Sequence, residues 1–357
     1  MCRAAWALAA ALLCACAWAD APCRIAYDLG SSGIRAGSTA VDTVVQADID
    51  YLGPLLAGRG LEETVAPTRA ALRELAERGG FPAHCQRVGG GFSAWRLALE
   101  RDSATLADIL ARIAAESGVA VLAIPQGIEG AYSHLAARRA LGSRFRTSHV
   151  LDIGGGSLQI AGERSAWGAL LGQKAWQREL CRALRVTDAL PCALQPMTRE
   201  ELATARALAA ALLGEAGKAL PETVSLTAIS RPVTRGVLPA VARLEGDGAV
   251  REGLARSSLA TAIDRLAGMT PQEMARLVGG PERFAPYLLS DMLLVEGVLI
   301  ATGGQTLQVA ETDLTNLPGL LADDHAFAWG RRHACYLARL RREGLDAYFG
   351  DPADCSE

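Results

Sequence analysis

Aromatic residues, excess positive charge and long apolar segments are all scarce in this sequence. Aromatic residues form 5% of the 357 residues, and the formal net charge is −3 at pH 7. A general nucleic-acid binder carries a basic surface with interleaved aromatic residues, so the composition argues against that class of protein. The N-terminal apolar run, residues 4–17, is too short to cross a bilayer. With 50% apolar and 21% charged residues, the chain is expected to be a soluble globular protein of two domains.

Residues 1–19 have the pattern of an export signal. Arg3 precedes the apolar run, and Ala17-Trp18-Ala19 is a small-x-small sequence of the kind that precedes a cleavage site. We therefore expect the mature chain to start near Asp20, without a membrane span, in the periplasm or outside the cell. A lipid anchor at Cys16 and a buried or amphipathic helix are the alternative interpretations of this segment.

The cysteines also favour an oxidising compartment. Three of the nine lie in the export signal, so an even number, six, remain in the mature chain. The paired short spacings that zinc sites use are missing, which favours disulfides over a metal site. The connectivity stays open, but position and spacing suggest three pairs: Cys23 with Cys85, Cys181 with Cys192, and Cys335 with Cys355.

The pattern of apolar residues divides the chain into an α/β part and a more helical part. Between residues 23 and 162, short apolar strands alternate with segments of helical periodicity, which predicts an α/β domain. Later in the chain, capping boxes at Thr198 and Thr270 predict two helix starts. We expect the arginines near the C-terminus to lie on the solvated face of a helix. The expected divisions are a signal at 1–19, an N-terminal domain at 20–162, a C-terminal domain at 163–323, and a basic helix and tail at 324–357.

Two segments far apart in the sequence share one design. Each has a short apolar strand, one aspartate and a turn of small residues, with Asp28 before the first turn and Asp152 before the second. The backbone N–H groups of such a turn can point at one phosphate, while the carboxylate holds a cation. Asp28 and Asp152 are therefore the expected metal ligands, and Mg²⁺ is the expected metal. The expected phosphate-binding residues of the turns are Gly30, Ser31, Ser32, Gly33, Gly154, Gly155, Gly156 and Ser157.

A carboxylate at a strand-to-helix junction lies between these two turns in the sequence. Glu129 falls in the first turn of a predicted helix that follows the strand ending at Ile124. The helix dipole alone can explain an acid there, but strand ends on one edge of an α/β sheet converge on one crevice. Transfer of a phosphoryl group to water needs donors to phosphate, a cation and a base that orients the water. Glu129 fits the base, and Arg35 and Arg96 are candidate clamps for phosphate charge.

These segments resemble the signatures of the acetate kinase/actin/Hsp70-like superfamily. The matching motifs are Asp-Leu-Gly-Ser-Ser at 28–32, Gly-Ile-Glu-Gly-Ala at 127–131 and Asp-Ile-Gly-Gly-Gly-Ser at 152–157. In order and spacing they are most similar to the exopolyphosphatase/guanosine pentaphosphate phosphatase (Ppx/GppA) family, where Arg96 would belong to a segment near the phosphate. The resemblance covers residues 24–162. It implies two actin-like (ribonuclease H-like) α/β domains with a cleft between them, the second more helical. It also implies magnesium, Glu129 as a catalytic residue, and release of orthophosphate from a chain end.

Two positions depart from the Ppx/GppA pattern and resemble secreted apyrases, the nucleoside triphosphate diphosphohydrolases. Leu158-Gln159 stands where the Ppx/GppA family has Thr-Glu, and Ser32-Gly33 stands in place of Asn-Ser or Asn-Thr. The apyrase resemblance implies that Gln159 positions the nucleophilic water beside Glu129, as a second catalytic residue. Against an apyrase, the chain is short and its second half has no clear pair of aromatic residues to stack on a base.

The sequence thus predicts an exported, magnesium-dependent phosphoanhydride hydrolase that releases terminal orthophosphate. Inorganic polyphosphate is the leading substrate, and nucleoside di- or triphosphates are the alternative. Guanosine pentaphosphate is disfavoured because an exported enzyme would rarely meet this cytoplasmic signal. A catalytically silent protein that binds polyphosphate or nucleotide is a second alternative, motivated by the missing Thr-Glu pair. A sugar kinase is disfavoured by Glu129. The oligomeric state, a homodimer included, stays open.

Overall fold

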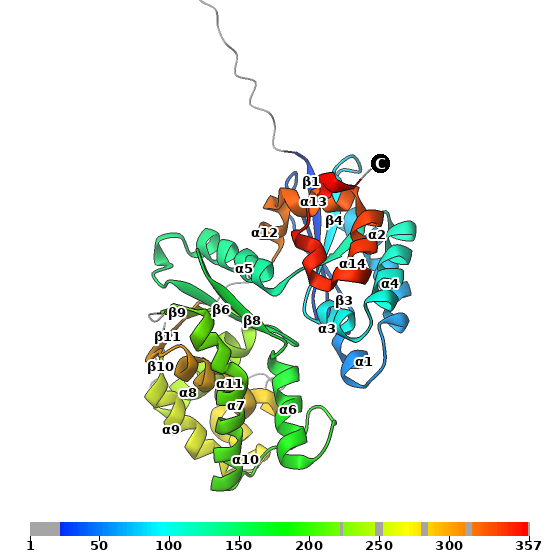
Figure 1. Ribbon diagram of the computed structural model, residues 1–357. Helices are drawn as coiled ribbons and strands as arrows, with labels where there is room; N and C mark the ends of the chain where they lie inside the picture. The colour runs from blue at the N-terminus through cyan, green and yellow to red at the C-terminus, as the bar shows by residue number, and fades with distance from the viewer. Residues whose placement is uncertain (1–21, 222–223, 247–252, 280–284, 311–315, 356–357) are drawn as a thin grey trace, which may run out of the picture.

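The computed structural model describes residues 22–221, 224–246, 253–279, 285–310 and 316–355. In Figure 1 the chain forms two lobes, one above the other, each built on its own β-sheet. The predicted export signal, with Cys16, lies outside the described residues. Among the helices that are described, none is both long enough and apolar enough to cross a membrane.

The first lobe, at the top of Figure 1, contains a five-stranded sheet with the order β3-β2-β1-β4-β5. β1 pairs antiparallel with β2 and parallel with β4, which runs parallel to β5. All six residues of β1 are buried, as expected for a central strand. The strands are β1 (Arg24–Leu29), β2 (Gly33–Ser38), β3 (Val45–Asp48), β4 (Gln86–Gly91) and β5 (Ala120–Ala123). The α-helices are α1 (Leu52–Leu56), α2 (Val65–Arg78), α3 (Ala94–Arg101), α4 (Ser103–Ser117), α12 (Leu317–Ala322), α13 (Asp324–Arg331) and α14 (His333–Glu343).

The second lobe contains a six-stranded sheet with the order β10-β11-β9-β6-β7-β8. Both predicted capping boxes are present: the Thr198 hydroxyl accepts from the Glu201 N–H, and Thr270 does the same with Glu273. The strands are β6 (His149–Ile153), β7 (Leu158–Gly162), β8 (Ala166–Ala169), β9 (Leu226–Ala228), β10 (Gly253–Ala255) and β11 (Thr306–Val309). The helices are α6 (Gln173–Arg185), α7 (Arg199–Ala219), a π-helix (Pro232–Val237), α8 (Leu238–Leu244), α9 (Arg256–Ala267), α10 (Pro271–Val278) and α11 (Leu288–Ala301).

The two sheets repeat one arrangement of strands. In the first lobe, the antiparallel strands β1, β2 and β3 are followed by β4 and β5, which run parallel to β1. In the second lobe, β6, β7 and β8 are antiparallel, and β9 and β11 run parallel to β6. The ends of β1 and β6 therefore occupy corresponding places in two similar sheets. This repeat confirms the prediction of two related α/β lobes.

The division between the lobes differs from the one expected at residue 162. β6 and β7 belong to the second sheet because β6 pairs with β9, while residues 317–343 return to the first lobe. α5 (Gln126–Leu141) lies between the lobes, packed against β6, β7 and β8 on one side and against α12 on the other. The segment expected as one basic helix at 324–357 forms α13 and α14, whose apolar residues join the first-lobe core.

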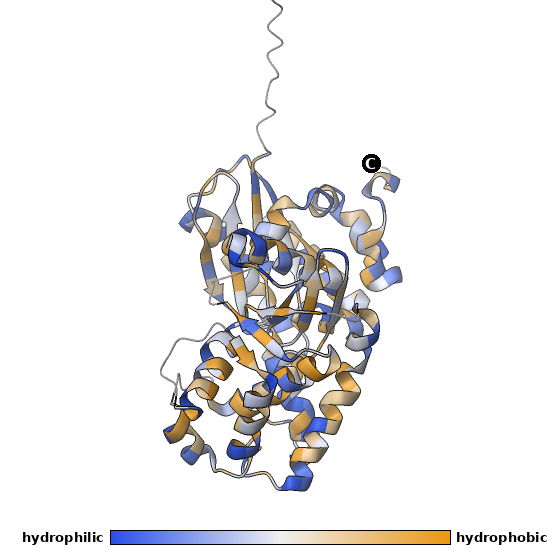
Figure 2. Ribbon diagram, turned by 90° about the vertical axis from the view of Figure 1, so that its left-hand side faces the viewer, coloured by the Kyte–Doolittle hydropathy of each residue, from blue (hydrophilic) through white to orange (hydrophobic). Residues whose placement is uncertain are grey.

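Each lobe has its own hydrophobic core, and apolar segments are correspondingly visible in both halves of Figure 2. β1 and α14 share the first core, where the Tyr336 hydroxyl donates to the carbonyl of Ala123 on β5 at 3.1 Å. In the second core, α11 is buried over almost its whole length, from Leu288 to Leu299. The two cores leave the ends of β1 and β6 free to form a site between the lobes.

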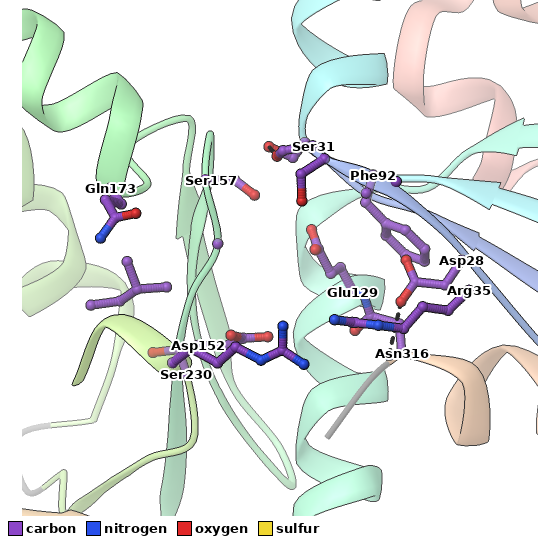
Figure 3. Close-up of a pocket in the computed structure, with 18 of the residues that line it drawn as sticks. Asp28, Ser31, Arg35, Phe92, Glu129, Asp152, Ser157, Gln173, Ser230 and Asn316 are labelled. Atoms are coloured by element: carbon purple, nitrogen blue, oxygen red, sulfur yellow. Dashed lines mark hydrogen bonds between the residues drawn. The ribbon is translucent and has the colours of Figure 1, made fainter. Parts of the chain in front are cut away.

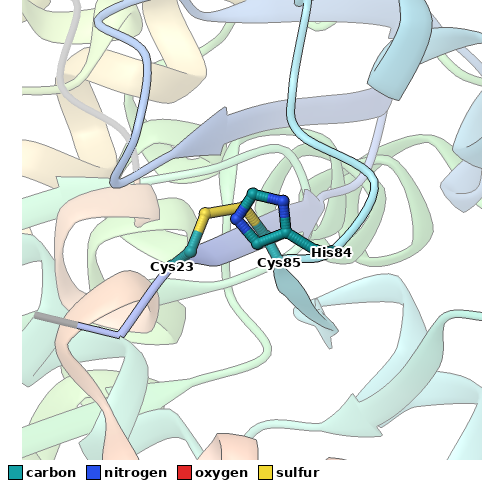
Figure 4. A group of neighbouring side chains, drawn as sticks. All are labelled: Cys23, His84 and Cys85. Atoms are coloured by element: carbon teal, nitrogen blue, oxygen red, sulfur yellow. A yellow bond between two sulfur atoms is a disulfide. The ribbon is translucent and has the colours of Figure 1, made fainter.

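The three suggested cysteine pairs are all disulfides in the structure. Cys23 and Cys85 join the starts of β1 and β4, and His84 lies beside them (Figure 4). Potential ligand atoms of these three residues lie within 4.8 Å of one another, but the disulfide occupies both sulfur atoms. We therefore interpret this group as a covalent link between strands, which suits an oxidising compartment.

Candidate active site

A cleft of about 410 Å³ lies between the lobes, at the ends of β1 and β6. Both predicted turns line it, together with Asp28, Glu129 and Asp152. Figure 3 shows Asp28 and Glu129 entering from one side and Asp152 and Ser157 from the other. The structure thus brings the three sequence motifs into one cleft.

The first turn connects β1 to β2. Its backbone closes with a hydrogen bond from the Gly30 N–H to the Gly33 carbonyl at 2.9 Å. Asp28 is directly opposite Arg35 in the β1–β2 pair, and both side chains line the cleft. The turn therefore presents small residues, one carboxyl group and one guanidinium group to the same space.

The second turn connects β6 to β7 with the same backbone geometry. The Gly154 N–H donates to the Ser157 carbonyl at 2.9 Å, and Asp152 is directly opposite Gln159. The start of α6 supports this turn, since the Lys174 N–H donates to the Gly155 carbonyl at 2.8 Å. The second turn is therefore held between its own hairpin and the first turn of α6.

The two turns contact each other across the cleft. A Cβ atom added to Gly155 would lie 3.2 Å from Cβ of Ser31, and one added to Gly156 would lie 2.5 Å from Oγ of Ser93. Ser31 and Ser93 are themselves hydrogen-bonded at 3.0 Å. Gly155 and Gly156 are thus required by the close approach of the first lobe.

Glu129 lies in the first turn of α5, where the residue is 6% exposed and its side chain lines the cleft. Its Oε2 accepts hydrogen bonds from Nη2 of Arg96 at 2.6 Å and from Nε2 of Gln159 at 2.9 Å. α5 approaches β7 closely here, because a Cβ atom on Gly130 would lie 2.8 Å from Cβ of Ala161. Both the backbone and the carboxylate of Glu129 are therefore fixed.

Arg96 and Gln159 lie behind Glu129 and are not among the residues that line the cleft. Arg96 is 1% exposed, and its Nη1 donates to the Ile124 carbonyl at 2.9 Å. Both side chains also donate to Oγ of Ser157, at 3.0 Å from Arg96 and 2.9 Å from Gln159. The structure thus places Arg96 as a partner of the carboxylate, away from the phosphate position expected from the sequence.

Burial makes ionisation of the two aspartates costly. Desolvation raises the pKa of Asp28 to about 6, with nearby Arg35 opposing the shift. It also raises the pKa of Asp152 to about 6, and the charge of Glu129 adds to that shift. A divalent cation between the two groups would offset this cost, and carboxylate oxygens are ligands that Mg²⁺ prefers. The donor set therefore fits a magnesium ion.

Helical segments between the lobes also contact the aspartates. Ser133 of α5 donates from Oγ to Oδ2 of Asp152 at 3.0 Å. The backbone N–H of Asn316, just before α12, approaches Oδ2 of Asp28 at 3.4 Å. Asn316 lines the cleft although no sequence motif singled it out.

The second lobe adds further cleft residues that sequence reasoning missed. They come from the start of α6 and from the segment after β9, neither of which has a strand–aspartate–turn pattern. The hydroxyl of Ser230 is buried and has no hydrogen-bond partner among the described residues. It therefore remains available to a ligand. The additional residues are Gln173, Lys174, Ser230 and Arg231.

Comparison with known proteins gives this geometry a family context. The model of the Ppx/GppA phosphatase family matches residues 92–315. The crystal structure of the Aquifex aeolicus Ppx/GppA family member has a TM-score of 0.61 at 17% identity, over 84% of this chain and 96% of that chain. An exopolyphosphatase from Cytophaga hutchinsonii has a TM-score of 0.59 at 15% identity, over 84% and 96%.

In sequence, the chain is 29% identical over 269 residues to an uncharacterised protein of Streptomyces coelicolor. That match covers 73% of this chain and 68% of that protein. The similarities to solved structures establish the two-lobed, actin-like α/β fold that was predicted from the motifs.

Proposed function

The chain belongs to the Ppx/GppA phosphatase family, and from this premise we propose that it hydrolyses phosphoanhydrides and releases terminal orthophosphate, with inorganic polyphosphate as the leading substrate. The observation that carries this proposal is the position of Glu129. Its carboxylate lines the cleft between two glycine–serine turns, and Arg96 and Gln159 hold it from behind. A fixed carboxylate beside a phosphate cradle suits activation of water.

In the proposed reaction, Glu129 orients a water molecule and accepts its proton. The water oxygen forms a bond to the terminal phosphorus, and the bond from that phosphorus to the bridging oxygen breaks. The bridging oxygen keeps the electron pair and leaves with the shortened chain, while the terminal group departs as orthophosphate. Catalysis then comes from positioning and charge stabilisation.

The two turns and Arg35 would bind the terminal phosphoryl group. The Gly30 and Gly154 N–H groups close the turns, but backbone N–H groups and serine hydroxyls at residues 31–33 and 155–157 can donate to its oxygen atoms. Arg35 adds a positive charge on the same side as Asp28. Asp28 and Asp152 would hold the divalent cation, which offsets the charge of the phosphate when bound.

We further propose that the protein is exported to the periplasm or secreted. The signal pattern at 1–19 and the three disulfides both support an oxidising compartment. Such a location makes guanosine pentaphosphate an improbable substrate. We also propose domain limits other than those expected from the sequence: the second domain holds the strands from β6 to β11, and α12, α13 and α14 belong to the first.

An apyrase-like activity is the second candidate, favoured by one observation. Gln159 takes the place of the glutamate expected in Ppx/GppA sequences, and its amide contacts Glu129. A silent polyphosphate- or nucleotide-binding protein is the third candidate. The fixed carboxylate of Glu129 favours an enzyme over this silent protein.

Phosphate release by the purified mature chain separates these candidates. We would measure turnover of inorganic polyphosphate, ATP, ADP and pyrophosphate with Mg²⁺, and again after chelation of the metal. Turnover of polyphosphate that chelation abolishes is the expected result. Turnover confined to nucleotides would support the apyrase, and tight binding of polyphosphate with no turnover of any substrate would support the silent protein.

A further inference from the structure

Lys174 is one of only two lysines in the chain, which carries 34 arginines. It is the second residue of α6 and lines the cleft. Because its N–H donates to the Gly155 carbonyl, its backbone is held beside the second turn. The side chain has a flexible four-carbon stem and a compact charge, so the ammonium group can change partners while the backbone stays in place.

The ammonium group of Lys174 faces the opposite lobe. Its Nζ lies 4.0 Å from Oδ1 of Asp50, in the loop between β3 and α1. The two side chains are 32% and 59% exposed, so this ion pair is weak and exchanges at little cost. Asp50 also accepts a hydrogen bond from the Gly53 N–H at 2.9 Å, which fixes its carboxylate independently of Lys174.

The charges that line the cleft explain why a positively charged side chain that can change its position is useful there. The carboxyl groups are those of Asp28, Asp48, Glu129 and Asp152, and the cationic side chains are those of Arg35, Lys174 and Arg231. A phosphoanhydride chain brings several more negative charges into this space. The repulsion falls if the ammonium group of Lys174 leaves the exposed Asp50 and moves to the phosphoryl oxygens.

We propose that Lys174 is a substrate-binding residue that exchanges partners. In the substrate-free protein it pairs with Asp50 of the first lobe, and in the complex it contacts the phosphoryl oxygens of a bound phosphoanhydride chain. The inference rests on the proposed function for its substrate class. With this inference the site includes Lys174, a residue that lies outside the aspartate–turn motifs.

The scarcity of lysine allows a direct test by amine acylation of the full mature chain. The Glu129→Gln variant would be acylated with and without inorganic tripolyphosphate and Mg²⁺, and the two lysines would be quantified by peptide mass spectrometry. We expect tripolyphosphate to slow acylation of Lys174 about tenfold, as for one charged contact. Lys218, on α7 and paired with Glu215, is the internal control and should be unaffected. Equal acylation of Lys174 in both conditions would overturn the proposal.

Substitutions in the active protein then test the exchange itself. Lys174→Ala should raise KM for tripolyphosphate about tenfold with little change in kcat, and Lys174→Arg should restore most of the binding. Asp50→Asn keeps an acceptor for the Gly53 N–H but releases Lys174, so KM should fall about twofold. If Asp50→Asn instead raises KM as Lys174→Ala does, the pair holds the lobes together and the exchange is wrong. Lys218→Ala is the matched control.

The two proposals can fail separately. Protection of Lys174 by tripolyphosphate in a protein that releases no phosphate would support the contact and reject the hydrolase. Phosphate release with an unprotected Lys174, and an unchanged KM in Lys174→Ala, would reject the contact and leave the hydrolase standing.

Discussion

The β1–β2 and β6–β7 hairpins share one backbone design but place different residues opposite their aspartates. Both turns close with the same N–H to carbonyl bond of 2.9 Å. Opposite Asp28 is Arg35, which lines the cleft, and opposite Asp152 is Gln159, which is buried and donates to Glu129. Under the proposed function the repeated fold would support two tasks: the first hairpin would offer positive charge to the substrate, and the second would hold Glu129, the proposed base.

The largest expected effect comes from removing the carboxylate that the second hairpin holds. Glu129→Gln keeps the size of the side chain but cannot accept a proton from water, so kcat should fall about 10³-fold. Steady-state phosphate release measures this loss, and retained binding of tripolyphosphate would show that the cleft is intact. Full activity in this variant would contradict the assignment of Glu129.

Substitutions opposite the two aspartates test the difference between the hairpins directly. Gln159→Leu removes one of the donors that orient Glu129, and a misplaced base should lower kcat about 10²-fold with a small change in KM. Arg35→Gln removes a positive charge from the cleft and should instead raise KM about tenfold. If both variants changed the same kinetic constant, the two hairpins would not have separate tasks.

Asp28 should lower the stability of the metal-free protein at neutral pH. Burial raises its pKa from 3.8 to about 6, so the folded state is penalised when this group ionises. The penalty is complete above the folded pKa, shrinks as the pH falls between the two values, and is absent below both. Asp28→Asn should therefore raise the free energy of unfolding near neutral pH by about 2–3 kcal/mol.

Urea unfolding of the metal-free protein at several pH values measures this gain. Added Mg²⁺ should stabilise the wild type and have a smaller effect on Asp28→Asn. Because the carboxylate must be ionised to bind the cation, the affinity of the wild type for Mg²⁺ should fall as the pH drops below about 6. If the difference in free energy of unfolding between the wild type and Asp28→Asn did not change with pH, the raised pKa of Asp28 would be contradicted.

The smallest effects are expected from substitutions at two glycines of α5, which form a closely matched pair. Gly130→Ala would bring a Cβ atom within 2.8 Å of Ala161 on β7, so α5 must shift away from the second hairpin. We expect a loss of about 1–3 kcal/mol in stability, with lower kcat. Gly127 has open space around it, so Gly127→Ala should be neutral or stabilise by up to about 1 kcal/mol. Equal effects of the two substitutions on unfolding would show that α5 does not depend on this contact.

Local patterns predicted the parts of the site that lie at strand ends. A buried strand followed by an aspartate and small residues identified both turns, and a carboxylate at the next strand-to-helix junction identified Glu129. Position and spacing also suggested the three disulfides that the structure contains. These features are encoded within a few consecutive residues or by simple spacing.

Contacts between distant segments could not be read in the same way. The sequence pattern places β6 in the first domain, because its pairing with β9, far along the chain, leaves no local signal. The charge of Arg96 suits a phosphate clamp, but only the folded structure shows that its guanidinium group pairs with the carboxylate of Glu129. Lys174 and Ser230 enter the cleft from segments that lack the aspartate–turn pattern.

The return of α12, α13 and α14 to the first lobe also determines the order in which the protein can fold during synthesis. The second sheet needs only residues up to Val309, whereas β4 and β5 are covered by helices that follow the second sheet in the chain. As the chain emerges from the ribosome, the lobe that starts first can be completed only after the second sheet has emerged. We expect a chain that stops before Asn316 to retain a folded second lobe and to leave the N-terminal sheet open.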